Sequence, residues 1–282
     1  MTTEPLIRNV SDTARWVAVF RAIESERPDA VFRDPFARRL AGERGEQIAA
    51  SIPFSGKHLW SWTSRTWLID QFILREVRHG ADLVINLAAG LDARPYRMEL
   101  PPSLQWVEVD LPEIVSYKEE VLGDEKPVCA LERVRLDLSD VDGRRELFAR
   151  LGARVRKAMI VTEGLLIYLA EAEVASLARD LAAAPSFQRW TMDLASPRLV
   201  RALQKKMGKQ LDRGNAPLKW GPEEGPEFFV PYGWKPAEVC SLLKTGLRLE
   251  RLPFWMRLFA RLEAPGFSPT RPWSGICLFG RT

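Results

Sequence analysis

Residues 82–97, DLVINLAAGLDARPYR, decide the fold of this chain. The run 83–87 is apolar at every position but one and has the length of a buried strand, and the small residues Ala88, Ala89 and Gly90 follow it at once. A turn of such residues lets the backbone come close to a bound ligand. The stretch therefore predicts the first strand of a βαβ unit, with a ligand site at the carboxyl end of that strand.

A second apolar run, WVEVD, ends at Asp110, about 20 residues after Gly90. This is the usual distance from the glycine turn of a nucleotide-binding unit to the acid that binds the ribose hydroxyls. The alternative interpretation is that Asp110 only caps a helix that begins at Pro112. The spacing predicts a cofactor that contains a nucleoside.

Composition indicates an ordinary globular protein of 282 residues, of which 46% are hydrophobic and 28% are charged. The 41 basic and 37 acidic residues give a net charge of +4 and are scattered, so we expect no nucleic-acid partner. Cys129, Cys240 and Cys277 are far apart, which predicts neither a disulfide framework nor a metal site. There is no signal-peptide pattern and no apolar run of ~18 residues, so we expect a cytoplasmic protein without a membrane partner.

Residues 1–80 precede the first strand and carry three helical patterns. These patterns begin near Ser11, near Asp34 and near Lys57, and the last one runs to His79. We interpret this part of the chain as a helical N-terminal cap, placed before a core that spans 81–282.

From residue 82 onward, strand-like runs alternate with helical segments. The runs are VINLAA, WVEVD, VCALERVRLDL, AMIVTEGLLIY, FQRWTMDL, LRLERL and GICLFG, and helical segments lie near 93–100, 112–122, 140–152 and 170–184. This alternation predicts an α/β fold with a Rossmann-like, mostly parallel sheet of seven strands. We expect the last two runs to close the sheet as an edge pair.

Residues 196–235 interrupt the alternation with a helix rich in lysine and arginine and then a loop rich in glycine and proline. A long irregular segment inside a compact domain is usually either disordered or a cover over a site. The aromatic residues Trp220, Phe228, Phe229, Tyr232 and Trp234 argue against disorder. We interpret the segment as a lid over the site.

Acidic residues stand where the first four strands end, which is the edge at which open α/β sheets bind ligands. They are Asp92, Asp110, Asp137 and Glu163, and solvated strand ends are the alternative interpretation. The glycine pattern of a pyrophosphate site is incomplete because Ala88 occupies its first position. An acid at position 92 would also repel a phosphate. The rim predicts a cationic nucleoside without phosphate, such as S-adenosyl-L-methionine.

Several motifs follow one another in a characteristic order: SDTARWVAVFRAIESERPDAVFRDPFA, SRTWLID, VINLAAGLDARPYR, WVEVDLPEI, RLDL and VTEGLLIYL. Together they resemble the leucine carboxyl methyltransferase family, in the branch of bacterial small-molecule O-methyltransferases that includes polyketide carboxyl methyltransferases. The resemblance covers roughly residues 10–195. It implies a class I methyltransferase fold that uses S-adenosyl-L-methionine.

The resemblance also implies roles for individual residues. Arg65 matches the arginine that binds the carboxylate of the cofactor, Asp110 matches the acid of the ribose site, and Glu163 matches an acid beside the methionyl end. Ala88 departs from the glycine of many relatives, and a surface helix position is the alternative for Arg65. The cofactor-binding residues implied in this way are Arg65, Ala88, Gly90, Asp92, Asp110, Leu111, Asp137, Leu138, Glu163 and Gly164.

Methyl transfer from a sulfonium is an in-line displacement, for which an enzyme mainly aligns the reactants and excludes water. It requires no metal, and we expect none. A carboxylate acceptor, with a pKa of roughly 4, is already ionised, whereas a phenol at about 10 needs a base. No histidine follows His79, so His58 and Tyr168 are the catalytic candidates, with plain packing as the alternative for both. We therefore expect a carboxylate acceptor.

The candidates for contact with the acceptor are Arg21, Arg97, Lys205, Lys209 and Trp220, although the lysines also fit a solvated helix face. The expected substrate is a small molecule of the polyketide type, and a phenolic hydroxyl or a protein C-terminus are the alternatives. A nicotinamide-dependent oxidoreductase and a non-catalytic Rossmann-like binding protein are alternatives of another class. A surface role of helix 198–209 on a membrane or nucleic acid is the remaining one.

Overall fold

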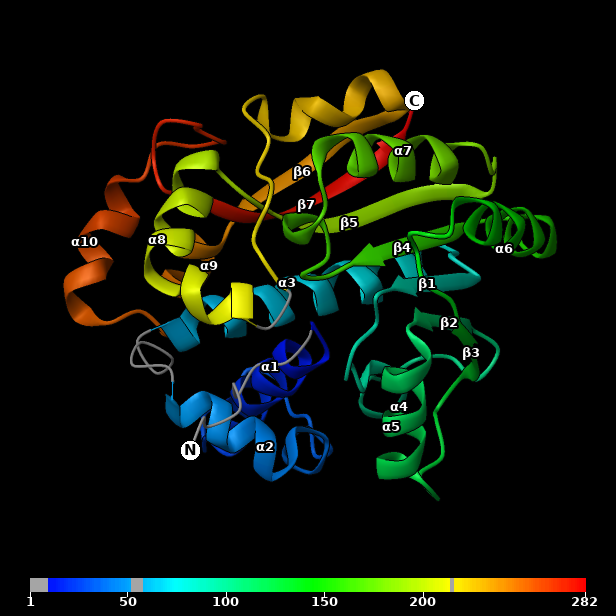
Figure 1. Ribbon diagram of the computed structural model, residues 1–282, viewed down its shortest axis with the longest axis horizontal. Helices are drawn as coiled ribbons and strands as arrows, with labels where there is room; N and C mark the ends of the chain where they lie inside the picture. The colour runs from blue at the N-terminus through cyan, green and yellow to red at the C-terminus, as the bar shows by residue number, and fades with distance from the viewer. Residues whose placement is uncertain (1–9, 52–57, 214–215) are drawn as a thin grey trace.

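The structure is a computed structural model, and it describes residues 10–51, 58–213 and 216–282. Seven strands form one sheet in the order β3-β2-β1-β4-β5-β7-β6 (Figure 1). Their bounds are β1 Leu83–Leu87, β2 Gln105–Asp110, β3 Ala130–Arg135, β4 Ala158–Thr162, β5 Phe187–Ala195, β6 Trp234–Ser241 and β7 Ser274–Arg281. Strands β1 to β5 are parallel, and β7 runs antiparallel to both β5 and β6. The predicted seven-stranded, mostly parallel sheet is confirmed.

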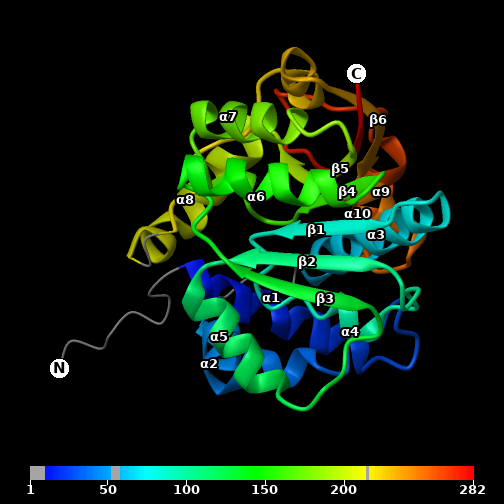
Figure 2. The same cartoon turned by 90° about the vertical axis from the view of Figure 1, so that its right-hand side faces the viewer.

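Helices cover both faces of the sheet, with α6 and α7 on one side and α1, α2 and α5 on the other (Figure 2). The helices are α1 Val10–Ser25, α2 Ala37–Ser51, α3 Leu59–Arg78, α4 Arg94–Arg97, α5 Pro112–Leu122, α6 Val141–Arg154, α7 Glu171–Ala182, α8 Pro197–Arg213, α9 Leu242–Arg248 and α10 Phe254–Leu262, with the 3-10 helices η2 Leu166–Tyr168 and η3 Gly225–Tyr232. Alternate residues of β1 serve the two faces, since Leu83 and Ile85 join the core under α6 and α7 while Val84 joins the core under α3.

The first three helices do not form one separate unit. Ile69 and Ile73 of α3 are fully buried against the sheet, so α3 is a layer of the core. Helices α1 and α2 pack on each other and on Leu91 and Ala93, which follow β1. They therefore cover the carboxyl end of β1. The expected start of the third helix at Lys57 lies outside the described residues.

The sixth strand differs from the prediction. The expected run LRLERL at 247–252 is the end of α9 and the turn after it, and the strand is Trp234–Ser241. Ser241 caps α9 by accepting a hydrogen bond from the Lys244 N–H, and the helix that starts there includes the first two residues of the expected strand. Pro236 made this segment look unlike a strand in the sequence, because proline is tolerated in a sheet only at an edge or a bulge. Strand β6 is an edge strand, and its register shifts at Pro236.

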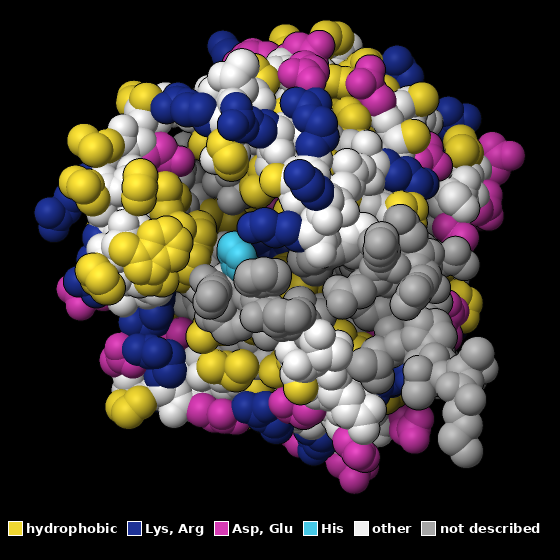
Figure 3. Space-filling model, turned by 60° about the vertical axis from the view of Figure 1, so that its left-hand side comes forward, with side chains coloured by type: hydrophobic (Ala, Val, Ile, Leu, Met, Phe, Trp, Pro, Cys, Tyr) yellow, Lys and Arg dark blue, Asp and Glu magenta, His cyan; other side chains and the backbone are white. Residues whose placement is uncertain are grey.

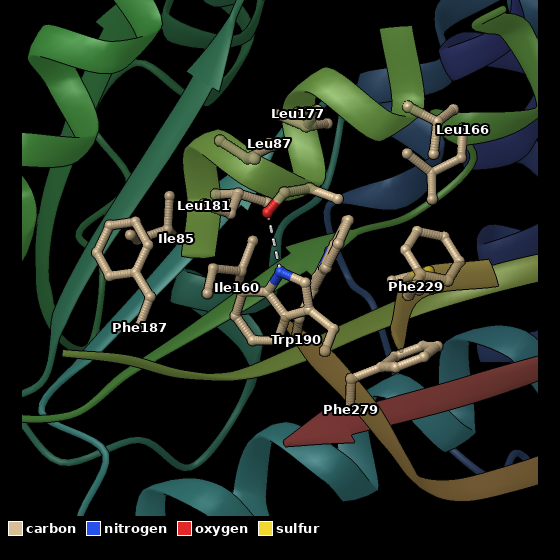
Figure 4. Close-up of a cluster of buried hydrophobic side chains, with 14 of the residues drawn as sticks. Ile85, Leu87, Ile160, Leu166, Leu177, Leu181, Phe187, Trp190, Phe229 and Phe279 are labelled. Carbon is tan, nitrogen blue, oxygen red and sulfur yellow. Dashed lines mark hydrogen bonds between the residues drawn. The ribbon is translucent and has the colours of Figure 1, made fainter. Parts of the chain in front are cut away.

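Part of the expected lid belongs to the core. Phe229 and Trp234 are fully buried and pack edge-to-face against Trp190 of β5, at centroid distances of 5.3 and 5.4 Å. Figure 4 shows Phe229 and Phe279 beside Trp190, each from a different element. The β6–β7 edge pair leaves one face of the sheet without an α-helix to cover it. Phe229 and Trp234 therefore complete the core on that face, against β5 and β7.

Replacing Phe229 by alanine should lower the free energy of unfolding by about 3–5 kcal/mol, because a fully buried ring is lost. Val230 is the matched control, since it is the next residue and is 39% exposed, and Val230→Ala should change stability by less than about 0.5 kcal/mol. Urea unfolding measures both. Equal stability of the two variants would mean that the segment is a detachable lid.

Candidate functional site

A cavity of about 860 Å³ lies where β1, β2, β3 and β4 end. Its size is in the range of small-molecule and cofactor sites. Helix α1 contributes Thr13, Ala14 and Trp16 to the opposite wall. The cavity brings together all the residues expected to bind a cofactor: Arg65, Ala88, Gly90, Asp92, Asp110, Leu111, Asp137, Leu138, Glu163 and Gly164.

The turn after β1 has the backbone that its sequence suggested. Ala88 and Gly90 have φ values of 51° and 52°, in the left-handed region that favours glycine. A Cβ on Gly90 would lie 3.3 Å from the Cβ of Ala14 in α1, so glycine also allows the helix to come close. Ala88 adopts the same conformation at a steric cost of about 1–2 kcal/mol. The departure from glycine therefore does not prevent the turn from forming.

Asp110 ends β2 and faces this turn. Its Oδ2 accepts a hydrogen bond of 2.6 Å from the Gly90 N–H, and its Oδ1 accepts one of 2.8 Å from the Leu111 N–H. Burial raises the pKa of Asp110, and the two backbone donors oppose that rise. Each carboxylate oxygen has two lone pairs, so both oxygens can still accept a bond from a ligand hydroxyl. The geometry suits a pair of neighbouring hydroxyls.

Asp92 is not the free acid that the sequence suggested. Its Oδ2 accepts hydrogen bonds of 2.7 Å from Arg94 Nη1 and of 2.7 Å from Asn86 Nδ2. Burial alone would raise the pKa of Asp92, but Arg94 and more distant cations outweigh it and hold the pKa well below its usual value. The same guanidinium binds Asp70 at 2.6 Å and Glu163 at 2.8 Å. Asp92 therefore serves to fix Arg94, and because its charge is paired, it does not repel a phosphate as the sequence suggested.

Arg65 of α3 lies at the end of β4. Its Nε is 2.9 Å from Glu163 Oε1, its Nη1 is 3.5 Å from Asp193 Oδ2, and its guanidinium lies over the Trp62 ring. Burial alone would raise the pKa of Glu163, but Arg94 and Arg65 outweigh it, so the pKa is lowered. Gly164 has a φ of 69°, and a Cβ there would approach Arg65 Nη1 to 3.3 Å. The side chain is buried, so the surface-helix alternative for Arg65 is wrong.

Asp193 of β5 is a site residue that the sequence analysis missed. Its Oδ1 accepts a hydrogen bond of 2.6 Å from the Gly164 N–H, and burial raises its pKa. It stands near the carboxyl end of the fifth strand, so the rule applied to the first four strand ends would have found it had it been extended to the fifth.

Two arginines that were candidates for contact with the acceptor form buried ion pairs with acids of the protein instead. Arg21 lines the large cavity, but it binds Asp34 at 2.9 Å and donates a 2.6 Å hydrogen bond to the Leu91 carbonyl, which ties α1 to the turn after β1. Arg97 is buried, binds Asp70 at 2.8 Å and lines neither cavity. The expected contact of Arg97 with a substrate is therefore wrong, because burial among acids fixes its guanidinium inside the protein.

A second cavity of about 420 Å³ shares Trp16, Trp62, Arg65, Gly164 and Tyr168 with the first. Most of its other lining is apolar, including Trp60, Leu166, Leu203, Leu218, Trp220 and Leu242. The two cavities therefore meet at a wall that contains a cation, a phenol and a glycine. An apolar molecule in the smaller cavity would lie next to a ligand in the larger one.

The remaining candidates lie at this second cavity or outside it. His58 and Trp220 line it, and Lys205 lines neither cavity and is exposed, whereas its neighbour Lys206 does line the second cavity. Partial burial and Lys206 lower the pKa of His58, so its imidazole is neutral at physiological pH. Burial raises the pKa of Tyr168, which keeps its hydroxyl protonated. The Lys209 side chain lies outside the described residues.

Neither a metal cluster nor a membrane-spanning helix occurs in the described part of the chain. Within 10–51, 58–213 and 216–282, histidine, cysteine and acidic side chains nowhere gather in a group of three that could hold a metal ion. Among the same residues, each helix is too short or too polar to cross a bilayer.

A known protein family matches the part of the chain that contains the large cavity's strand ends. The model of the family described as leucine carboxyl methyltransferase matches residues 14–182, from α1 to the end of α7. The chain belongs to the leucine carboxyl methyltransferase family. The family match contains the large cavity's strand ends from β1 to β4, and the segments from β5 onward lie beyond it.

Two relatives carry the name of S-adenosyl-L-methionine-dependent methyltransferase. One, from Streptomyces coelicolor, is 33% identical over 249 residues, which cover 82% of this chain and 84% of the relative. The other, from Rhodococcus jostii, is 35% identical over 176 residues, which cover 58% of each chain. The match to the Rhodococcus jostii protein therefore spans little more than half of its length.

Solved structures with the same fold are more distant in sequence. A DUF574 family protein from Streptomyces avermitilis superposes with a TM-score of 0.61 at 13% identity, covering 96% of this chain and 97% of that one. A protein of Thermobifida fusca described as a methyltransferase superposes with a TM-score of 0.57 at 14% identity, covering 98% and 96%. These similarities support the Rossmann-like methyltransferase fold of this family member.

The Arg94→Met substitution should destabilise the protein by about 3–5 kcal/mol, because it leaves the buried Asp92 without its ion pair and removes one of the two cations bound by Asp70 and by Glu163. The control Arg135→Met breaks a surface pair with Glu119 and should cost at most about 1 kcal/mol. Urea unfolding measures both free energies.

The same variant should also reverse a pH dependence. In the native protein the pKa values of Asp92 and Glu163 are lowered, so their contribution to stability is present above about pH 4 and is lost as the pH falls through the folded-state values. Without Arg94, Asp92 loses its ion pair and burial raises its pKa, so the unfolding free energy should increase from about pH 7 to about pH 5. A variant that loses stability on acidification as the native protein does would contradict this account.

Proposed function

We propose that this chain is an S-adenosyl-L-methionine-dependent O-methyltransferase that methylates a carboxylate of a small apolar molecule. Its membership of the leucine carboxyl methyltransferase family supports methyl transfer. One observation carries the proposal. The large cavity at the strand ends, which contains charged side chains and has Asp110 opposite the Gly90 turn, meets an apolar cavity at Arg65, Gly164 and Tyr168. The first fits a nucleoside cofactor and the second fits a methyl acceptor.

The residues of the large cavity fit this cofactor in chemistry and in charge. The remaining lone pairs of the two Asp110 oxygens would accept the ribose hydroxyls, and Leu111 and Leu138 would flank the adenine. Arg65 uses Nε and Nη1 in its ion pairs, so Nη2 is the nitrogen to which the cofactor carboxylate would bind. When bound, the cofactor supplies an electrophilic methyl group on a sulfonium.

The buried charges around the methionyl end leave a negative surplus. The connected ion pairs contain five carboxylates, of Asp34, Asp70, Asp92, Glu163 and Asp193, and four guanidinium groups, of Arg21, Arg65, Arg94 and Arg97. The methionyl end of the cofactor carries an ammonium, a sulfonium and a carboxylate, which sum to one positive charge. The surplus carboxylate offsets that charge, and a dinucleotide with its pyrophosphate would increase the imbalance.

A carboxylate acceptor agrees with the groups at the shared wall. Tyr168 is held protonated by its raised pKa, so it can donate a hydrogen bond to an acceptor oxygen but cannot remove a proton at neutral pH. The indoles of Trp16, Trp60 and Trp62 offer flat apolar surfaces for the body of the acceptor. An acceptor that is already ionised requires only alignment and exclusion of water, which these groups provide.

A phenolic acceptor is the second candidate, and Asp193 is the observation that favours it. This acid lines the apolar cavity and has a pKa raised by burial, as a carboxylate that serves as a general base would have. The neutral imidazole of His58 lies at the same cavity. The two acceptors give different products, an ester or an ether.

The Asp110→Asn variant should bind S-adenosylhomocysteine, the demethylated cofactor, about 10- to 100-fold more weakly, because a charge-assisted hydrogen bond is lost. Asp140→Asn is the matched control, since Asp140 caps α6 on the same side of the sheet without lining the cavity, and its affinity should stay within about twofold. Isothermal titration calorimetry measures both. Binding of NAD in place of S-adenosylhomocysteine by the native protein would refute the proposal.

Incubation with labelled S-adenosyl-L-methionine and a set of flat apolar carboxylic acids should give a methylated product that mild base hydrolyses back to the acid. Mass spectrometry before and after base treatment identifies it. The matching phenols serve as the control set. A base-stable methyl ether, formed from the phenols alone, would establish the second candidate in place of the first.

A further inference from the structure

Helix α10, Phe254–Leu262, exposes an unusual amount of apolar surface. Five of its nine residues are large hydrophobic side chains that are mostly in solvent: Phe254 at 84% exposed, Trp255 at 56%, Leu258 at 62%, Phe259 at 63% and Leu262 at 74%. Figure 3, in which the α10 side of the molecule comes forward, shows a contiguous hydrophobic patch there. Monomeric proteins rarely expose such a patch without a binding partner.

The exposed side chains form one face. At 100° per residue, positions 254, 258, 262, 255 and 259 fall within an arc of about 140°. Ala260 and Met256 lie on the opposite side, where Ala260 is 1% exposed and Met256 is half-buried. The helix therefore turns its narrow side to the protein and its wide apolar face to solvent, the reverse of an ordinary surface helix.

Positive charge borders this face. Arg257 and Arg261 follow it on the helix surface and are both exposed. Glu263, the acid just after the helix, is turned inward and accepts a 2.6 Å hydrogen bond from the Ser241 hydroxyl. An apolar face with an arginine border is the pattern of a helix that lies in a membrane interface.

We propose that α10 docks on the surface of an anionic lipid bilayer, with Phe254, Trp255, Leu258, Phe259 and Leu262 in the boundary between headgroups and acyl chains. The charge decides between this partner and a second copy of the chain. Two copies joined through this face would bring the arginines of both helices together, and α10 itself has no acid to pair with them. Anionic headgroups neutralise them instead.

The position of α10 gives this docking a consequence for the site. Met256 on its inner side and Leu243 of α9 line the apolar cavity, so one helix forms both the docking face and a wall of that cavity. The helix lies beyond the span matched by the family model, which ends at Ala182. The docking itself depends only on the surface of α10, and it can be tested without methyl transfer.

Cosedimentation of the full chain with vesicles tests the proposal. We expect binding to phosphatidylcholine vesicles that contain about 30% phosphatidylglycerol and weaker binding to pure phosphatidylcholine. The variant Trp255→Gln/Leu258→Gln/Phe259→Gln should lose at least about 10-fold in affinity. Val128→Gln/Val230→Gln is the matched control, since both valines are exposed at 39% and lie outside α10, and it should bind as the native chain does.

A second variant tests the arginine border without removing apolar surface. Arg257→Gln/Arg261→Gln should lose about 10-fold in affinity for the anionic vesicles and most of the salt dependence, with binding to pure phosphatidylcholine unchanged. All variants should keep the native thermal shift with S-adenosylhomocysteine, which reports that they are folded.

Two outcomes overturn the proposal. In the first, the native chain stays in the supernatant with anionic vesicles. In the second, light scattering finds a dimer that the Trp255→Gln/Leu258→Gln/Phe259→Gln variant abolishes, which would make a second copy the partner of this face. Neither outcome bears on methyl transfer, so failure of the docking and failure of the proposed function remain distinguishable.

Discussion

The ion pairs of the buried Arg94 guanidinium with Asp70, Asp92 and Glu163 hold the site together. These acids come from α3, from the turn after β1 and from the end of β4, so one cation joins three segments that are distant in the chain. A buried ion pair stabilises little by comparison with apolar packing, but removing one partner leaves a charge that water cannot reach. The network therefore fixes the relative positions of the segments that surround the large cavity.

The network continues outward through shared partners. Asp70 also binds Arg97, Glu163 also binds Arg65, and Asp34 joins Arg97 to Arg21 of α1. Arg21 in turn holds the carbonyl of Leu91. Helix α1 is thus attached to the turn after β1 by charge as well as by packing, and it closes one side of a cavity whose floor is made by strand ends. A cofactor there would meet walls that are already ordered.

Sequence patterns predicted the parallel part of the sheet well, because its central strands β1, β2 and β4 are buried on both faces and have the sequence of short, mostly apolar runs. They failed at β6, where Pro236 and a polar edge strand resemble a loop, and where a leucine-rich run that resembles a strand is capped into α9. They also assigned Phe229 and Trp234 to a lid, although both belong to the core. An aromatic residue in an irregular segment gives the same sequence pattern whether it packs in a core or covers a site. The same limit applies to Asp92, because sequence gives the presence of an acid and not of its counter-ion.

The sequence by itself determined the fold class and the strand-end residues that line the large cavity. The reason is local: the apolar run, the small-residue turn and the acid at the usual distance lie within one βαβ unit, and a short segment carries all three. Only the tertiary structure decided which charges are paired, that Asp193 belongs to the site, that a second apolar cavity meets the first at Arg65 and Tyr168, and that α10 faces solvent with its apolar side. These features arise from contacts between segments far apart in the chain, and burial and ion pairing depend on such contacts.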